Sequence, residues 1–492
     1  MLLIMFKSKT KYEYIYYSII IIGVLLATIQ LLFNRSLWLD EVSIARNLLN
    51  RDFLELLKPL EHGQIAPIGY LYITKVFGLI FGYGEISLRF YSYLSYIFSI
   101  PLLYYASLRL SSNNRVISLL SVAIFSISMT SIYYASELKQ YSSDILICLV
   151  ILNSFLLYNE NSRSIKYLIL FGITGVVSIW FSNIAIICLF SFGTYLLYDK
   201  VYKNRNFLFI IILSLWILSF VIYYFNFIYL HPTTAYMQEY WHNNFMSFDV
   251  FSVDFYLFWA RVYYHSFALL FSDSYLGIFI FPIILFSIFR LIRVKKYWIL
   301  FILIFPIVVH LCLSGLKLYP YALRLILYLS PLLIYLYANG LFEIYQLIKN
   351  KSKYLKVLVL IPILISVYPV WKDFPLEKEE LKPLLSILDK EMDEGETLYI
   401  YYATNFAFKY YQQINFCDVR GDVIYGTINR ENINGYNQEL SELLELETNY
   451  YLLFSHDYKY ERDYFVYFLL ENGSTVITEE FTNGCWLYYM KN

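Results

Sequence analysis

Residues 14–41 read YIYYSIIIIGVLLATIQLLFNRSLWLDE, a long apolar segment that ends in an acidic pair. The apolar part, from Tyr14 to Phe33, is long enough to cross a bilayer as a helix. The pair Asp40 and Glu41 follows closely and is therefore expected where a membrane helix meets water. Carboxylates held at such a boundary can meet a lipid-borne molecule on one side and a soluble molecule on the other.

The composition of the whole chain indicates a polytopic membrane protein. Of its 492 residues, 59% are hydrophobic and only 15% are charged, whereas a soluble protein carries about 25% charged residues. The 53 tyrosines and eight tryptophans suit a chain with many membrane–water interfaces, where amphipathic rings settle. A formal net charge of zero provides no basic field for nucleic acid. The first apolar segment is too long for a cleavable signal and is expected to remain as a span.

Hydropathy predicts eleven membrane spans, and the charges of their connections orient them. Lysine and arginine collect on alternate connections, on the side that also holds the N-terminus. The positive-inside rule places that side in the cytoplasm and puts Asp40, the 231–273 loop and everything after about Trp371 outside. The expected spans lie near residues 14–33, 88–108, 116–134, 142–158, 166–182, 183–199, 207–230, 274–292, 297–315, 321–340 and 354–371.

The first outer loop, residues 34–87, contains a second apolar run, Ile65 to Phe81. This run is short and contains Lys75, and counting it as a span would reverse the orientation of every later connection. We therefore expect a helix that lies on or dips into the outer leaflet, which a segment covered by protein can do.

After Trp371 the chain becomes polar, and runs typical of helices and strands replace the apolar spans. The pattern predicts a transmembrane part, residues 1–371, and a small outer α/β domain, residues 372–492, of a size that can form its own core. The expected elements are a helix over 377–393, a strand over 396–402, a helix ending near Gln412, and strands over 450–454, 475–481 and 485–489.

The cysteines and histidines do not predict a metal site. The five cysteines have no metal-ligand spacing, and the histidines of the 231–273 loop match no standard zinc pattern. Cys417 and Cys485 would be able to form a disulfide if their domain faces an oxidising space. A divalent metal remains compatible with the acidic pair, which can bind a cation or act without one.

Three stretches predicted on the outer face carry the side chains best suited to chemistry. Their carboxylates, lysines and arginine suit a phosphate-bearing headgroup beside a nucleophile that must lose a proton. Within the same face, Arg89 is expected to pair with Glu85, four residues earlier on one helix. The candidate residues are Asp40, Glu41, His62 and Gln64 in the first stretch, Glu137, Lys139 and Tyr141 in the second, and Lys317, Tyr319 and Arg324 in the third.

Structural interpretations of the same residues stay open. Asp40 and Glu41 suit the first turn of a helix that begins near Val42. Glu137 and Lys139 would also be explained as a cluster of charges at the membrane interface. Arg324 would be explained as a long side chain that reaches from a helix end to water.

In their order along the chain, five motifs resemble those of bacterial family-39-type glycosyltransferases of the GT-C superfamily. Distant relatives there are dolichyl-phosphate-mannose–protein mannosyltransferases and lipid A aminoarabinose transferases. The resemblance covers roughly residues 30–340, and Ala66-Pro67 stands where many relatives have two prolines. The matching segments are WLDE (38–41), PL with QIAP (59–60 and 64–67), FGYGEISLRF (81–90), YYASELKQYSSD (133–144) and LYPYALR (318–324).

The resemblance implies an enzyme of the bacterial plasma membrane that works on cell-envelope glycans. Such a hexosyl- or pentosyltransferase takes a sugar from a polyprenyl-phosphate donor and passes it, usually with inversion, to a glycan, lipid or protein acceptor on the outer face. Asp40 matches the proposed base of the family, and Glu41 is the adjacent acid. Glu137 and Lys139 match the second-loop acid and its basic neighbour, and Arg324 matches the basic residue near the carrier phosphate.

Two other functions stay open at this stage. A polysaccharide polymerase is also polytopic, but its donor would be a diphosphate-linked oligosaccharide. A transporter of lipid-linked sugars would carry ionisable groups or broken helices near the bilayer midplane and would have two related halves. The charges collect instead at predicted outer helix ends, and the halves of the sequence do not repeat.

Overall fold

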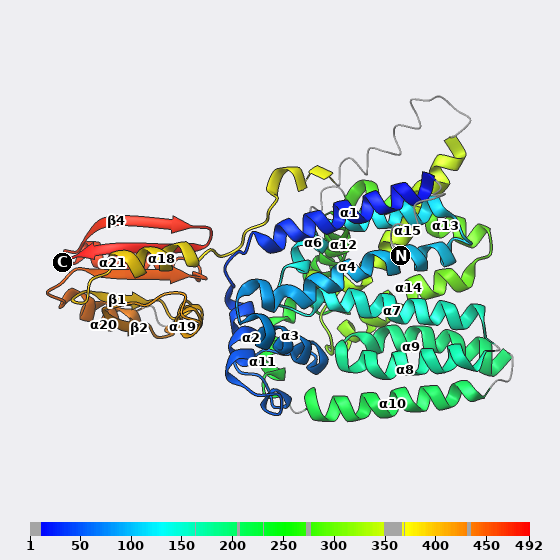
Figure 1. Cartoon of the computed structure of the whole chain (residues 1–492), viewed down its shortest axis with the longest axis horizontal. Coiled ribbons are helices and arrows are strands. Elements are labelled where there is room, and N and C mark those ends of the chain that lie inside the picture. The colour runs from blue at the N-terminus through cyan, green and yellow to red at the C-terminus, as the bar shows by residue number, and fades with distance from the viewer. Residues whose placement is uncertain are drawn as a thin grey trace.

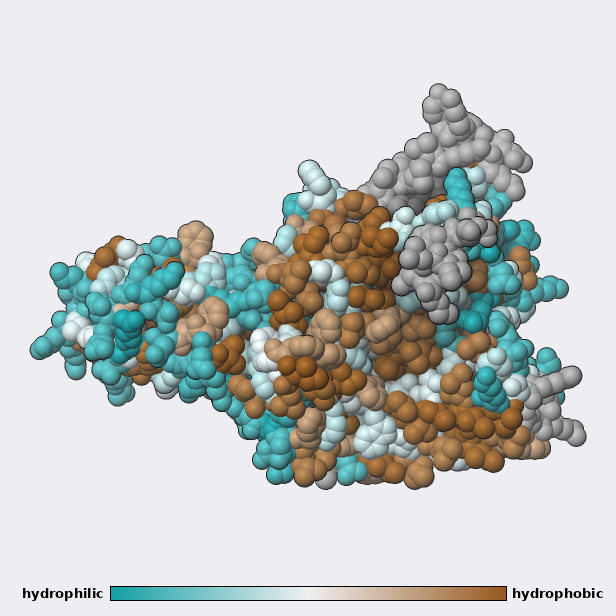
Figure 2. Space-filling view, in the orientation of Figure 1, coloured by the Kyte–Doolittle hydropathy of each residue, from teal (hydrophilic) through white to brown (hydrophobic). Residues whose placement is uncertain are grey.

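The computed structural model describes residues 11–162, 164–203, 207–229, 231–271, 277–348, 367–368, 370–430 and 434–492. A bundle of helices makes up most of the protein, and a small sheet domain lies beyond one end of it (Figure 1). Helices α2, α3 and α11 lie at the end of the bundle that faces the sheet. Apolar residues dominate the visible surface of the bundle, whereas hydrophilic residues dominate the surface of the sheet domain (Figure 2).

The helices of the bundle follow one another with short connections. The longer ones are α1 (Lys11–Leu32), α2 (Leu39–Asn50), α3 (Ile68–Phe81), α4 (Glu85–Leu110), α5 (Arg115–Ser126), α6 (Met129–Ala135), α7 (Tyr141–Glu160), α8 (Ile165–Phe181), α9 (Ala185–Leu196), α10 (Leu208–Phe227), α11 (Thr234–Tyr240), α12 (Val253–Phe271), α13 (Gly277–Arg293), α14 (Tyr297–Gly315) and α15 (Ser330–Ile348). Single turns are η2 (Glu55–Leu57), η4 (His242–Asn244), η6 (Leu323–Leu325) and η7 (Leu327–Leu329), and η3 (Leu197–Lys203) is a π-helix.

Within the described residues, five helical stretches are long and apolar enough to cross a membrane: α1, α7, α10, α14 and Leu327–Ile348. The pair α5 and α6 would make a sixth span, although it bends by 60°. The bend falls at Ser128, whose hydroxyl accepts a hydrogen bond from the backbone N–H of Ser131 and so starts α6 anew. Five or six spans therefore meet this test rather than the predicted eleven, and most of the predicted span 354–371 lies outside the described residues.

Two predicted boundaries are wrong. The predicted loop 231–273 contains α12, a helix of 19 residues that contacts α6, α13 and α15. Its Asp254 and Arg261 lower the hydropathy of this segment and concealed the helix. The predicted span 321–340 begins later, because residues 323–329 form the turns η6 and η7 and the continuous helix starts at Ser330.

The short helix predicted over the apolar run Ile65 to Phe81 is confirmed as α3. Lys75, which argued against a span, lies inside the protein rather than in lipid. Its ammonium donates hydrogen bonds to the carbonyl of Leu48 at 2.7 Å and to the hydroxyl of Tyr83 at 3.3 Å. Helix α3 therefore directs this charge toward α2.

The C-terminal sheet has five strands in the order β2-β1-β3-β5-β4. Strands β2, β1 and β3 pair in parallel, whereas β5 pairs antiparallel with β3 and β4. The four predicted strands are confirmed, but β2, α20 and α21 were not predicted, and Cys417 and Cys485 are buried and unpaired. The elements are α18 (Lys382–Glu391), β1 (Thr397–Ile400), α19 (Asn405–Gln413), β2 (Asp422–Tyr425), α20 (Gly435–Leu444), β3 (Tyr450–Ser455), α21 (Glu461–Glu471), β4 (Thr475–Thr482) and β5 (Cys485–Lys491).

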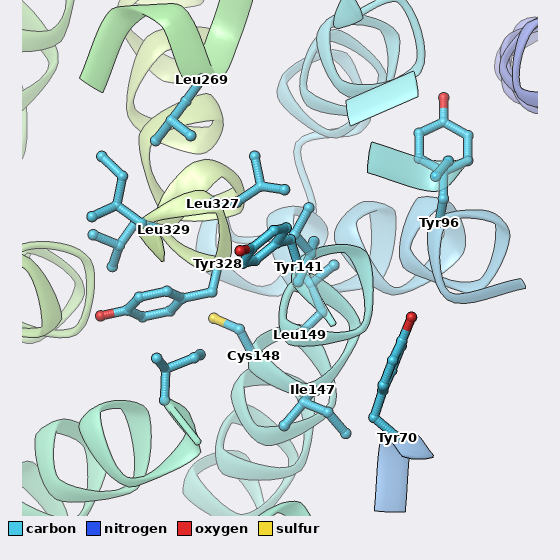
Figure 3. Packing of buried hydrophobic residues seen from close by; sticks show 14 of the residues in the cluster. Tyr70, Tyr96, Tyr141, Ile147, Cys148, Leu149, Leu269, Leu327, Tyr328 and Leu329 are labelled. Carbon is cyan, nitrogen blue, oxygen red and sulfur yellow. The ribbon is translucent and has the colours of Figure 1, made fainter. Parts of the chain in front are cut away.

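Helix α7 forms the centre of the bundle core, and 83% of its most apolar stretch of 18 residues is buried. Tyr141, Cys148 and Leu149 of this helix pack among apolar residues that include Leu327 and Tyr328 of η7 (Figure 3). Tight packing of this kind restricts movement of the elements involved. Helix α7 and the turn η7 are therefore held firmly against each other.

Candidate active site

Asp40 and Glu41 owe their positions to the start of α2. Trp38 is the last extended residue before this helix, with φ −83° and ψ 170°. Both acids fall in the first turn, where unpaired backbone N–H groups and the helix dipole favour carboxylates. Successive residues of a helix point about 100° apart. The two carboxylates consequently face different surroundings, although they are neighbours in the sequence.

Asp40 is the point at which the three predicted outer-face stretches meet. Arg324 of η6 donates from NH1 to Asp40 Oδ2 at 2.8 Å, and Lys139 Nζ lies 4.0 Å from the same oxygen. Lys139 belongs to the turn between α6 and α7, and its ammonium donates to Gln64 Oε1 at 2.5 Å. The Arg324 guanidinium also lies over the ring of Trp241, 5.0 Å from its centroid.

The charges around Asp40 keep its carboxylate ionised. Burial alone would raise the pKa of Asp40, but Lys139, Arg324 and Lys378 outweigh it and lower the pKa below its usual value. Burial lowers the pKa of Lys139, an effect that the nearby Asp40 opposes. Asp40 keeps 24% of its side-chain surface exposed, so this ionised group is still within reach of a ligand.

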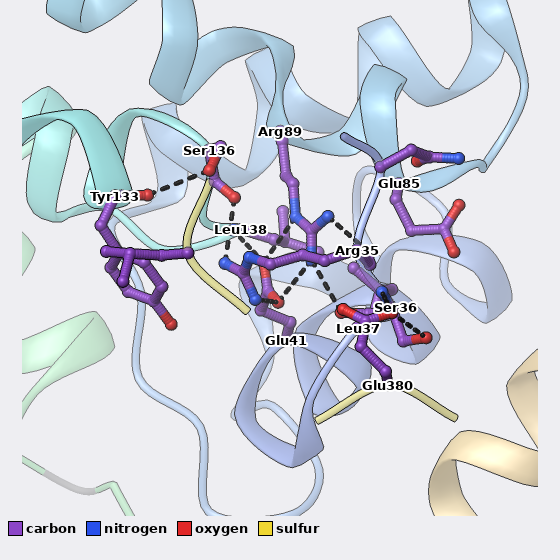
Figure 4. Close-up of polar contacts among 12 residues, drawn as sticks. Arg35, Ser36, Leu37, Glu41, Glu85, Arg89, Tyr133, Ser136, Leu138 and Glu380 are labelled. Atoms are coloured by element: carbon purple, nitrogen blue, oxygen red, sulfur yellow. Dashed lines mark hydrogen bonds and ion pairs between the residues drawn. The ribbon is translucent and has the colours of Figure 1, made fainter. Parts of the chain in front are cut away.

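Glu41 lies in a closed ionic network (Figure 4). Its Oε2 accepts from Arg35 NH1 at 3.1 Å and from Arg89 NH2 at 2.7 Å. Its Oε1 accepts from Arg89 Nε at 2.8 Å and from the backbone N–H of Leu138 at 2.7 Å. Burial opposes ionisation, yet the two arginines lower the pKa of Glu41. The carboxylate is thus fully buried and bound on both oxygens, which suits a positioning role better than contact with a substrate.

The predicted pair of Glu85 and Arg89 is wrong. Arg89 turns to Glu41, whereas Glu85 Oε1 lies 2.9 Å from Lys382 Nζ and accepts from the hydroxyl of Tyr411 at 3.0 Å. Both partners of Glu85 belong to the C-terminal part of the chain. The partners of Glu85 and Arg89 are thus residues distant in the sequence, which a spacing of four residues on one helix does not predict.

Glu137 lies in the same turn as Lys139, and 1% of its surface is exposed. Its Oε2 is buried, and no side chain or backbone group among the described residues hydrogen-bonds to it. Burial is the main reason that the pKa of Glu137 is raised, and the negative charge of Glu41 adds to the effect. A buried polar atom of this kind is rare and often marks a binding or catalytic role.

Some of the remaining candidates lie near Asp40, Lys139 and Arg324, and others lie away from them. Gln64 binds Lys139, and Tyr141 is among the groups that raise the pKa of Arg324 against the effect of burial. Tyr319 packs its ring 5.3 Å from that of His310. His62 instead packs against Phe406, with ring centroids 4.2 Å apart, and Lys317 is exposed. Within the described chain, no hydrogen bond or ion pair links His62 or Lys317 to Asp40.

Two residues near the site were missed in the sequence. Arg35 precedes Asp40 in the same loop and was not among the candidates. Lys378 belongs to a run of charged residues after Trp371 that has no periodicity pointing to a site. Only the fold shows that this run approaches Trp38.

The fold is similar to that of solved GT-C glycosyltransferases, in agreement with the resemblance of the motifs. ArnT from Cupriavidus metallidurans, solved bound to undecaprenyl phosphate, superposes with a TM-score of 0.55 and 11% identity over 98% of each chain. The apo form of the same ArnT superposes with a TM-score of 0.53 and 11% identity over 95% of this chain and 97% of that chain. ArnT is an aminoarabinose transferase.

A second GT-C enzyme is also similar in structure. The oligosaccharyltransferase of Archaeoglobus fulgidus, solved with zinc and sulfate, gives a TM-score of 0.51 and 13% identity over 88% of this chain and 67% of that one. At such identities the likeness concerns the fold. No protein-family model matches the sequence, and no curated protein matches it either.

Proposed function

We propose that this protein is a membrane glycosyltransferase that moves a hexosyl or pentosyl unit from a polyprenyl-phosphate donor to an acceptor on the outer face, with inversion. The observation that carries the proposal is the meeting of Asp40, Lys139 and Arg324 from three distant segments at one end of a GT-C fold. The undecaprenyl phosphate bound to ArnT supports a donor of this lipid class.

The proposal includes a topology in the bacterial plasma membrane. Ten of the eleven spans would be formed by α1, α4, α5 with α6, α7, α8, α9, α10, α13, α14 and α15, with the N-terminus in the cytoplasm. The predicted eleventh span, residues 354–371, lies mostly outside the described residues. Residues 1–371 would be the catalytic part, and residues 372–492 an outer α/β domain. Helix α4 supports this orientation, because Arg89 lies beside Glu41 and Arg109 lies at the other end, roughly 30 Å along the axis.

Asp40 is proposed to act as the general base. An acceptor hydroxyl attacks the anomeric carbon, the bond from that carbon to the phosphate oxygen breaks, and the electron pair leaves with the polyprenyl phosphate. The hydroxyl proton passes to Asp40. Among the described contacts, both cations bind Oδ2 of Asp40, so Oδ1 is the oxygen suited to accept the proton. The low pKa of Asp40 is acceptable because the oxocarbenium-like sugar makes the hydroxyl acidic late in the step.

The cations are proposed to stabilise the leaving phosphate. Negative charge grows on the phosphate as the bond breaks, and positioned ammonium and guanidinium groups stabilise it in a partly dry site. Arg324 and Lys139 now lie beside Asp40, so a bound phosphate competes for them. When they turn to the phosphate, Asp40 loses their charge and becomes a stronger base.

The residues do not fit a metal centre. Within the described part of the chain, no three His, Cys, Asp or Glu side chains gather in a way that could hold an ion. Asp40, the most accessible carboxylate of the group, is bound by cations. We therefore derive no step through a metal.

Transfer by the purified protein tests the proposal. The protein, reconstituted in vesicles, is given radiolabelled polyprenyl-phosphate sugars and candidate glycan, lipid or peptide acceptors. The proposal expects label in the acceptor and release of polyprenyl phosphate. Movement of intact labelled donor across the bilayer without consumption would contradict it and favour a transporter, and use of diphosphate-linked oligosaccharides alone would favour a polymerase.

A further inference from the structure

The segment that leads into the C-terminal domain is tied to the first outer loop. Gln30 and Leu376 exchange two hydrogen bonds of 2.8 Å, one in each direction. Glu380 Oε2 accepts from the backbone N–H and the hydroxyl of Ser36 at 3.0 and 3.1 Å. Lys382 donates to the carbonyl of Asn34 at 2.6 Å. We call residues 376–382 the strap, and these contacts hold it against the chain that leads to Asp40.

One side chain of the strap reaches the candidate active site. The ammonium of Lys378 lies over the ring of Trp38, 2.9 Å from its centroid. Trp38 directly precedes α2, the helix that carries Asp40. The neighbour Glu379 pairs through Oε1 with His456 Nδ1 at 2.7 Å, which holds the strap on its other side. A lysine cation on an aromatic face is attracted by the ring but keeps its N–H donors available.

The charges around Lys378 leave room for an anion. Within the described residues, each of the other cations of this group has a polar partner. Arg35 and Arg89 bind Glu41, Arg324 binds Asp40, and Lys139 binds Gln64. Among the residues that the structure describes, no carboxylate oxygen lies within 4.0 Å of the Lys378 ammonium. Lys378 is therefore the cation of this group whose N–H donors are left for an anion, because the ion pairs and hydrogen bonds of the other four are already made.

We propose that Lys378 binds the phosphate of the lipid-linked donor, so that the C-terminal part of the chain completes the active site. This inference rests on the proposed function and adds a residue that the first outer loop cannot supply. The ring of Trp38 positions the ammonium, and a phosphate oxygen takes the place that no carboxylate occupies. A charge-assisted contact of this kind is among the stronger hydrogen bonds. It also explains why the strap is bound so closely beside Asp40.

Binding of undecaprenyl phosphate to the full-length protein in detergent tests the inference. Lys378→Gln is expected to raise the dissociation constant about tenfold. Lys378→Arg is expected to have a dissociation constant within a few-fold of the wild-type value. Lys409→Gln is the matched control, because Lys409 also lies over an aromatic ring, 4.2 Å from the centroid of Tyr425, but belongs to the sheet domain. It is expected to bind as the wild type does.

Inorganic phosphate, used as a competitor in a separate series, reports recognition of the headgroup without the lipid chain. If the inference is right, inorganic phosphate displaces the lipid less effectively from Lys378→Gln than from the wild type. Equal lipid affinity of Lys378→Gln and the wild type would overturn the inference alone. Failure of the wild type to bind undecaprenyl phosphate would overturn the proposed function together with the inference. Weaker lipid binding by Lys378→Arg than by Lys378→Gln would also contradict the inference, because the positive charge would then not be the cause of binding.

Discussion

Asp40 and Arg324 are 284 residues apart in the sequence, yet Arg324 NH1 donates to Asp40 Oδ2 at 2.8 Å. The pair joins the first turn of α2 to the turn η6, which lies shortly before α15. It also gives one carboxylate two functions in the proposed reaction: it holds the arginine before the donor binds, and it accepts a proton after the arginine has turned to the phosphate. Binding of donor and activation of the base are thereby coupled.

Asp40→Asn removes the proposed base and keeps the size of the side chain. We expect transfer to fall by about 10²–10⁴, the usual contribution of general-base catalysis. Initial rates with a radiolabelled polyprenyl-phosphate sugar are the measurement. Asp52→Asn is the control, since Asp52 lies twelve residues further along the chain and its Oδ1 accepts a hydrogen bond from the backbone N–H of Glu55. Near-normal turnover by Asp40→Asn would refute the assignment.

Arg324→Gln is expected to shift the pH dependence of the reaction. Arg324 lowers the pKa of Asp40, so its removal raises that pKa. The base works only when it is ionised, and activity is lost as the pH falls through the pKa of Asp40. The acid limb of kcat/KM should therefore move to higher pH, in addition to any loss of rate.

The matched control for this shift is Arg290→Gln. Arg290 pairs with Glu343 at 2.8 Å on α13 and α15, away from Asp40. Its removal should leave the acid limb where it is. An unchanged limb in Arg324→Gln would show that the ionisation of Asp40 does not govern the reaction.

The sequence predicted the meeting of Asp40, Lys139 and Arg324 because each residue lies near the end of an apolar segment, at the end that the alternating charges of the connections assign to one side of a membrane. Sidedness follows from the charge of the connections, which is a local property. The partner of Arg89 was not predictable in this way. Arg89 pairs with Glu41, whereas Glu85 is bound by Lys382 and Tyr411, which lie about 300 residues further along the chain.

Helix α12 and Lys378 show the same limit in two forms. Asp254 and Arg261 make α12 too polar for a hydropathy signal, and its contacts with α6 and α15 stabilise it as a helix. Lys378 lies in a charged run that resembles any solvated linker. In both cases packing against distant segments decides the structure, and no periodicity of the sequence records that packing.

Glu41→Gln is expected to destabilise the protein. The substitution leaves Arg35 and Arg89 buried without a counter-charge, a loss that typically costs about 3–5 kcal/mol of the free energy of unfolding. Denaturant titration of the detergent-solubilised protein measures this change. Glu61→Gln breaks a pair with Arg51 in which the glutamate is 63% exposed, and it should cost no more than about 1 kcal/mol. Equal effects of the two substitutions would contradict the structural role of Glu41.

Tyr411→Phe is expected to loosen the contact between the two parts of the chain. The hydroxyl of Tyr411 accepts a hydrogen bond from the backbone N–H of Leu37 at 2.8 Å and donates one to Glu85 Oε1 at 3.0 Å, and the residue is buried. Its removal leaves a buried donor and a buried carboxylate oxygen each short of a partner, at a cost of about 1–3 kcal/mol.

Because Leu37 directly precedes Trp38, release of this contact should free the strap and expose it to protease. Limited proteolysis in detergent, followed by mass spectrometry of the fragments, measures the rate of cleavage within residues 376–382. We expect faster cleavage in Tyr411→Phe and an unchanged rate in Tyr460→Phe, whose side chain is 79% exposed. A strap equally protected in both variants would mean that other contacts, such as the pair formed by Gln30 and Leu376, are sufficient to hold the C-terminal domain in place.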